Sequence, residues 1–171
     1  MKQFTFLLIL CLGQTSLLPQ DKRTDTNFRL IEDFEKHKST FQSDTFELYD
    51  HSTDGGQLIA YYAKDKEYRV FDIWLFGETG KLHATYWTDN DLKIKIIKRT
   101  NFDYDKPYYE KGYKVTETME YLSHEDNSVK RYNRDKRELN DGLSDTKASE
   151  GQTFFDDIIK DVNIMKLWHR P

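Results

Sequence analysis

Asp72 has the strongest case for acid-base chemistry in this sequence, because alternation places it on an otherwise apolar face of a predicted strand, residues 68–76. A carboxylate in such a place either pairs with a basic side chain from a neighbouring strand or acts as a perturbed acid in a pocket. A glycoside hydrolase needs a second carboxylate across a cleft, and the sequence identifies none for Asp72. Glycan hydrolysis by Asp72 or by a loop carboxylate is therefore an alternative function.

Acidic residues also gather in three predicted loops, at residues 89–91, 103–105 and 125–127. Carboxylates bind calcium, but these spacings do not match an EF-hand loop. Asp and Asn also favour turns, because their side chains bond to nearby backbone groups. We expect turn formation, and a calcium-stabilised structural module using Asp103 and Asp105 is a second alternative.

The histidines and the glycine-rich segment at residues 77–81 do not indicate a metal or cofactor site. A catalytic zinc site usually takes three protein ligands, and no two histidines have His-x-x-x-His spacing. A phosphate-binding loop needs glycine at position 75 and Ser or Thr at position 82, where this chain has leucines. We expect a hairpin turn at residues 77–81, a packed or exposed His83, and no cofactor.

Aromatic side chains are the best candidates for binding. Tyr and Trp combine a large apolar area with a polar tip, which suits protein interfaces and stacking on sugars. Most of these side chains could instead fill the core, since sheets are rich in aromatic residues. The candidate binding residues are Tyr61, Tyr86, Trp87, Tyr104, Tyr108 and Tyr109, with Tyr62 and Phe102 beside them.

The first 20 residues predict a secretory signal peptide. Lys2 supplies a positive charge, residues 4–12 are apolar, and small or polar residues at 13–16 lead to charged sequence from Asp21. The apolar run is much shorter than the roughly 20 residues of a transmembrane helix. We expect a periplasmic or extracellular protein cleaved between residues 15 and 20. Cys11 follows Leu10 where a lipobox usually has a small residue, so a lipid anchor at Cys11 is the minority alternative.

The composition supports one exported domain, residues 21–171. Cys11 is the only cysteine, so no disulfide framework is possible. The net charge of −4 argues against non-specific nucleic-acid binding. The 11 Tyr, 11 Phe and 3 Trp residues supply the apolar area that disordered chains lack.

Hydrophobic periodicity predicts about six antiparallel strands, with a seventh as an open alternative. A helix is expected at residues 28–38, capped by Thr26 or Asn27, and a short strand at residues 46–49. Short polar turns between apolar runs indicate hairpins, because parallel strands need long crossovers. A longer connection is expected at residues 100–112 and a turn at 123–128. The six predicted runs are residues 58–63, 68–76, 81–88, 92–99, 113–122 and 129–133.

The predicted sheet has one dry face and one mixed face. Phe71, Ile73 and Leu75 share one face of a central strand. In the run 92–99, Ile94 and Ile96 are expected to share a face opposite the lysines, as in a half-exposed strand.

The C-terminal part predicts an amphipathic helix on the dry face. Residues 140–148 are expected to form a linker, and a capping box at residues 149–152 is expected to begin the helix. The predicted fold class is α+β, a central antiparallel β-meander with an N-terminal helix and a C-terminal amphipathic helix.

Three segments carry a resemblance. Residues 55–62, 76–81 and 86–87 together resemble small exported bacterial β-meander proteins of unknown function, whose hairpins repeat a Tyr-Tyr, turn and apolar-run pattern. The resemblance spans residues 55–122 and implies the compartment and the meander, and it transfers no functional residue.

These observations favour an exported, non-catalytic binding protein. The mixed sheet face and the 100–112 connection would engage an envelope protein or polysaccharide. The alternatives are an envelope glycan hydrolase and a calcium-stabilised module.

Overall fold

The computed structural model describes residues 25–126 and 128–162 of the 171-residue chain. The predicted signal peptide, which includes Cys11, lies outside the described residues. The elements in chain order are α1 (Phe28–His37), the short 3-10 helix η1 (Lys38–Thr40), β1 (Gln42–Leu48), β2 (Gly56–Tyr62), β3 (Tyr68–Gly77), β4 (Gly80–Asp89), β5 (Ile94–Tyr104), β6 (Val115–Glu125), β7 (Ser128–Asn133) and α2 (Ser144–Val162).

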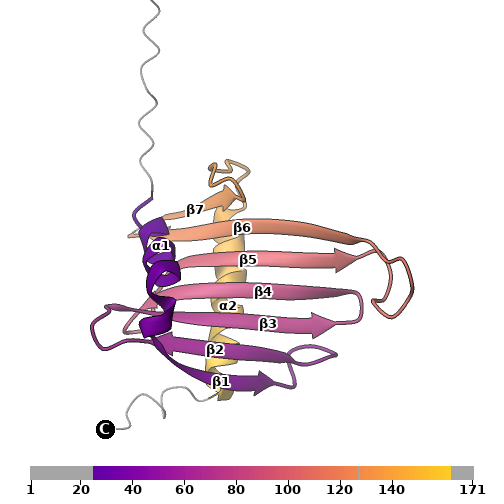
Figure 1. Ribbon diagram of the computed structural model, residues 1–171. Coiled ribbons are helices and arrows are strands. Elements are labelled where there is room, and N and C mark those ends of the chain that lie inside the picture. The colour runs from indigo at the N-terminus through magenta and orange to yellow at the C-terminus, as the bar shows by residue number, and fades with distance from the viewer. Residues whose placement is uncertain (1–24, 127, 163–171) are drawn as a thin grey trace, which may run out of the picture.

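The seven strands form one antiparallel meander, in which each strand pairs with its neighbours in the sequence (Figure 1). The predicted α+β class with a helix at each end is confirmed. The additional strand is β1, and the predicted run at residues 46–49 covers only its second half. β5 continues to Tyr104 and β6 to Glu125, so the connections that follow them are shorter than predicted.

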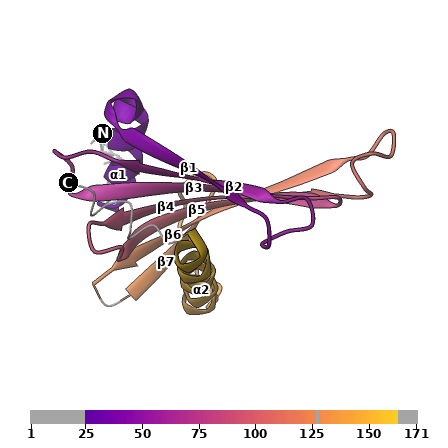
Figure 2. The ribbon, with the colours of Figure 1, turned by 90° about the horizontal axis from the view of Figure 1, so that it is seen from below.

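The two helices lie on opposite faces of the sheet, which we call the α1 face and the α2 face. Seen from below, strands of the sheet extend past both helices at the end away from α1 (Figure 2). None of the helices in the described part of the chain is long and apolar enough to span a membrane.

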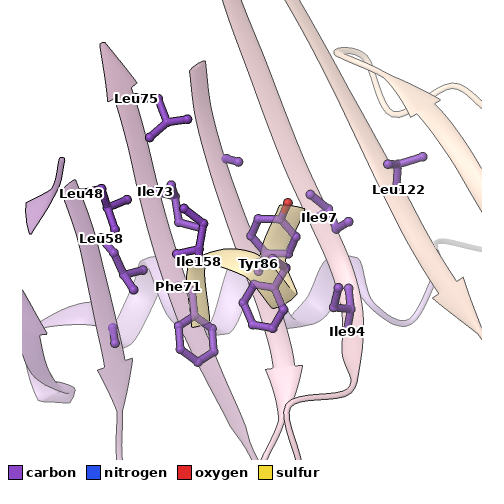
Figure 3. Close-up of a cluster of buried hydrophobic side chains, with 13 residues drawn as sticks. Leu48, Leu58, Phe71, Ile73, Leu75, Tyr86, Ile94, Ile97, Leu122 and Ile158 are labelled. Atoms are coloured by element: carbon purple, nitrogen blue, oxygen red, sulfur yellow. The ribbon is translucent and has the colours of Figure 1, made fainter. Parts of the chain in front are cut away.

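The α2 face is the dry face predicted from the sequence. Phe71, Ile73 and Leu75 are buried there, as expected (Figure 3). Phe71 meets Phe155 of α2 edge to face, with ring centroids 5.1 Å apart. The Tyr86 hydroxyl donates a hydrogen bond of 3.1 Å to the carbonyl of Gly151, which seats α2 on the sheet.

The start of α2 corrects the predicted linker and capping box. The helix begins at Ser144, so residues 144–148 belong to it. The Lys147 amide donates to the Leu143 carbonyl at 3.0 Å, which is the i to i−4 spacing of an α-helix. Ala148 and Gly151 are buried. These buried small residues let the first turns of α2 pack closely, although the segment is polar and has no clear period.

The α1 face holds a second core beneath α1. Phe28 packs edge to face on Tyr121 and Tyr132, each at 5.2 Å, and Phe34 packs in the same way on Tyr61 at 5.1 Å. These contacts explain the helix, because its apolar side has a partner only on this face.

Polar contacts fix α1 at one end of the sheet. Asn27 is the N-cap residue, one of the two predicted, but its side chain forms no capping hydrogen bond. The side-chain amide of Asn27 instead donates to the Lys95 carbonyl at 3.0 Å, the Ser123 hydroxyl at 2.8 Å and the His124 carbonyl at 3.0 Å. Farther along α1, the Asp33 carboxylate accepts hydrogen bonds from Lys66 and Tyr68, which lower its pKa to about 2.

A β-bulge overturns the predicted face of Ile94. The register shifts between Trp87, which pairs with Ile96, and Thr88, which pairs with Ile94. The bulge adds a residue to β5 and reverses its alternation. Ile94 and Ile97 therefore join the α2-face core, whereas Ile96 joins the core beneath α1.

Candidate binding surface

The α1 face has an open end, because α1 crosses the strands only near their other end (Figure 1). In the register of β3 and β4, Trp74 lies opposite His83, and Phe76 lies opposite Lys81. Lys81 in turn lies opposite Phe102 of β5. Cross-strand partners point to the same face, so these side chains form one surface. We call the four rings of Trp74, Phe76, His83 and Phe102 the aromatic platform.

The rings of the platform are almost parallel. The plane of Trp74 is within 9° of the plane of His83, 13° of Phe76 and 15° of Phe102, with centroid distances of 3.9, 6.2 and 6.1 Å. All four residues are half-buried. The rings of the platform therefore pack well enough to be ordered, and they remain accessible to a ligand.

Asp72 holds one ring of the platform from the neighbouring cross-strand row. Its carboxylate Oδ1 lies 2.5 Å from His83 Nε2 and accepts a hydrogen bond of 3.1 Å from the Thr85 hydroxyl. Burial raises the pKa of Asp72, but the hydrogen bonds of His83 and Thr85 and the charges of His83 and Lys38 together outweigh it, and the net pKa is below its ordinary value. Asp72 is thus ionised at neutral pH and holds His83, so of the two alternatives drawn from the sequence, the structure has the pairing with a basic residue of a neighbouring strand.

Three of the predicted binding residues are in the core. Tyr61, Tyr86 and Trp87 are only 9, 2 and 1 % exposed. Tyr86 and Trp87 are consecutive, so they enter the α2-face core and the core beneath α1, respectively. For these three side chains the alternative of core filling is confirmed and the prediction of a binding surface is wrong, because both faces of the sheet are covered where they lie.

The other three predicted residues lie at the open end. Tyr104 is half-buried and packs against Tyr113 with ring centroids 5.2 Å apart, whereas Tyr108 and Tyr109 are 50 and 63 % exposed. The amides of Tyr104 and Tyr108 donate hydrogen bonds of 2.9 Å to the carbonyls of Thr79 and Glu78. These bonds tie the β5–β6 loop to the β3–β4 turn, beside the platform.

Trp74 and Phe76 were not predicted from the sequence, and His83 was predicted only to be packed or exposed. The available signal was the i, i+2 spacing of Trp74 and Phe76 on a strand whose other face is fully apolar. To predict that His83 and Phe102 join Trp74 and Phe76 in one surface, the pairing register of three strands is needed, and the sequence alone does not give that register.

The acidic loops form turns, as expected. Asp105 Oδ1 accepts a 2.7 Å hydrogen bond from the Lys114 amide and closes the base of the β5–β6 loop. Asp89 Oδ1 accepts bonds from the amides of Asp91 and Lys93. Within residues 25–126 and 128–162, no group of three or more His, Cys, Asp or Glu side chains could hold a metal ion.

A separate cleft of about 730 Å³ lies at the start of α1, away from the platform. His124 lines it, and burial lowers the pKa of this histidine. His124 Nε2 is buried without a hydrogen-bond partner among the described residues.

No protein-family model, curated protein or solved structure matches this chain, so its function is argued from the geometry of the platform.

Proposed function

We propose that this chain is an exported, non-catalytic binding protein that holds an envelope polysaccharide on the open end of its α1 face. The observation that carries the proposal is the aromatic platform, in which Trp74 and three nearly parallel rings stand on an uncovered part of the sheet. The predicted signal peptide supports the envelope as the place of action.

Parallel aromatic rings suit a saccharide ligand. The face of an aromatic ring carries negative charge density, and the C–H groups of a sugar ring form a weakly positive apolar face that stacks on it. Contacts with His83, Phe76 and Phe102 restrict the Trp74 ring before any ligand arrives. Binding then costs little additional side-chain entropy.

Asp72 supports binding better than hydrolysis. A general acid in a glycosidase needs a raised pKa so that it holds a proton at neutral pH. The pKa of Asp72 is shifted downward, because His83 and Thr85 stabilise the carboxylate. Asp72 therefore positions His83 and has no proton to give to a leaving group.

A protein partner is the second candidate, favoured by the β5–β6 loop. Tyr108, Tyr109 and Tyr113 are exposed there. Tyrosine is enriched at protein interfaces, and this loop is held to the β3–β4 turn by backbone hydrogen bonds. Such a partner would contact the edge of the platform.

Co-sedimentation with protein-free polysaccharide from the envelope of the producing organism tests the proposal. We expect the wild-type protein to be retained and Trp74→Ala to lose about tenfold in affinity, roughly the 1.4 kcal/mol of a good ring contact. Tyr49→Ala is the matched control, because Tyr49 is 77 % exposed and lies outside the platform. Equal retention of Trp74→Ala and wild type would overturn the proposal.

The mass of the protein from its native host tests export. A mature chain that begins between residues 17 and 21 is expected in the soluble pool. An acylated chain that begins at Cys11 would show that the protein is lipid-anchored and not a free exported domain. Retention of Met1 would contradict export.

A further inference from the structure

Building on the proposed function, we infer that the saccharide is acidic and carries uronate carboxylates. The inference rests on the charges that surround the aromatic platform. Within the described residues, Lys81 and Lys98 flank it along the strands without a carboxylate partner, whereas Asp72 and Glu117, the acidic residues next to the platform, are already paired. The surface therefore offers unpaired positive charge in a protein whose net charge is −4.

Lys81 supplies the first charge. It lies between Phe76 and Phe102, in the cross-strand row next to the Gly77–Gly80 pair that borders the β3–β4 turn. Its ammonium is 5.9 Å from the centroid of the Phe76 ring, and its side chain is exposed. Among the residues that the structure describes, Lys81 forms no ion pair.

Lys98 supplies the second charge on the other side of Trp74. It lies opposite Thr85 of β4 and Tyr121 of β6, in the row that also contains Asp72. It is half-buried and forms no ion pair with a carboxylate in residues 25–126 or 128–162. A lysine stem can lie along apolar neighbours while the ammonium reaches water.

The two carboxylates next to the platform are compensated, and Glu47, the exposed acid in the row of Trp74, lies two strands away from it beyond Gln57. Asp72 is bonded to His83 and Thr85, and Glu117, which lies opposite Phe102, pairs with Arg134. A bound acid would therefore meet the ammonium groups of Lys81 and Lys98 without displacing an existing partner. The attraction of a bound carboxylate to Lys98, which is half-buried, is stronger than in bulk water, whereas the exposed Lys81 adds a weaker attraction that salt screens.

The spacing of the lysines suits a chain of acidic sugars. Lys81 and Lys98 are separated along the strands by four residues and across them by one strand, which places their backbones roughly 14 Å apart. The row of Trp74 and His83 lies between them. A sugar stacked on Trp74 would thus have one ammonium on each side, within reach of carboxylates on the neighbouring sugar units.

Calorimetric titration with two matched ligands tests the inference. The ligands are a galacturonate hexasaccharide and the same hexasaccharide with its carboxylates reduced to neutral hydroxymethyl groups. We expect the acidic ligand to bind at least tenfold more tightly, with an affinity that falls as salt is added. In the double variant Lys81→Gln, Lys98→Gln, we expect this preference to vanish while binding of the neutral ligand is unchanged.

Two control variants separate the possible outcomes. Lys64→Gln removes an exposed lysine in the β2–β3 loop, and we expect it to keep the preference. Trp74→Ala should weaken the binding of both hexasaccharides. Equal binding of the two ligands would overturn the inference and leave the proposed function standing. If neither hexasaccharide binds but envelope polysaccharide still retains the protein in a Trp74-dependent way, only the inference is overturned. If neither hexasaccharide binds and that retention is also absent, the inference and the proposed function are both overturned.

Discussion

The imidazole of His83 lies flat against the indole of Trp74, with ring centroids 3.9 Å apart and 9° between the planes. The same imidazole is held by Asp72, whose Oδ1 is 2.5 Å from His83 Nε2. The carboxylate therefore positions the histidine, and the histidine positions the indole. This chain of contacts gives an open sheet surface an ordered stacking site.

Trp74 should contribute much less to folding than a core aromatic residue. Trp74→Ala removes ring contacts on a half-exposed face, and we expect a loss of about 1–2 kcal/mol in the free energy of unfolding. Phe71→Ala empties a position that is 0 % exposed and should cost about 3–5 kcal/mol. Urea denaturation measures both losses. Equal losses would mean that Trp74 is a core residue and not a binding residue.

Asp72 should stabilise the fold in a pH-dependent way. Its pKa in the folded protein is below the ordinary value of 3.8, so the ionised form is favoured by folding. The contribution is fully present above the unfolded pKa and is lost as pH falls through the folded pKa. The difference in stability between wild type and Asp72→Asn should be constant from pH 7 to about pH 5 and shrink below about pH 4. Urea midpoints across this range measure it, and a gap that widens at low pH would contradict the assignment.

His124 should make the protein less stable in mild acid. Burial lowers its pKa in the folded state, so below about pH 6.5 the unfolded chain takes up a proton that the folded chain does not. Stability should therefore fall as pH drops from 7.5 to 5.5. In His124→Asn this part of the decline should disappear. The measurement is the unfolding midpoint at each pH, and an unchanged slope in the variant would refute the role of His124.

Gly56 should be intolerant of a side chain. A Cβ atom there would overlap the backbone oxygen of Trp74 and lie 2.6 Å from Leu75 Cδ2. We expect Gly56→Ala to cost roughly 1–3 kcal/mol, because β2 and β3 must separate locally. Gly77→Ala is the control, since its nearest neighbour would be 3.4 Å away. Thermal unfolding of the two variants compares them, and similar melting temperatures would contradict the expected clash.

The sequence predicted the strands well where apolar runs are bounded by turn residues. The order β2 to β7 and the dry face carrying Phe71 and Ile73 follow from period and alternation alone. The start of α2 and the first half of β1 were not predicted, because their polar residues carry no period. Ile94 was placed on the wrong face because a bulge is not visible in alternation.

The candidate site was less predictable than the fold. Tyr86 and Trp87 are neighbours on one strand, so alternation alone excludes them from a common surface. Trp74 and Phe102 are 28 positions apart in the sequence, and only the register of β3, β4 and β5 brings their rings together. The pairing of Asp72 with His83, and the lack of an ion-pair partner for Lys98 among the described residues, likewise depend on neighbouring strands.

Two-dimensional NMR of the indole N–H groups tests the central claim most directly. Trp168→Phe leaves two indoles, Trp74 on the platform and Trp87, which is 1 % exposed in the core. On titration with solubilised envelope polysaccharide, we predict that the Trp74 signal shifts progressively while the Trp87 signal stays in place. Polysaccharide binding that leaves the Trp74 signal unmoved would contradict the assignment of the open α1 face as the binding surface.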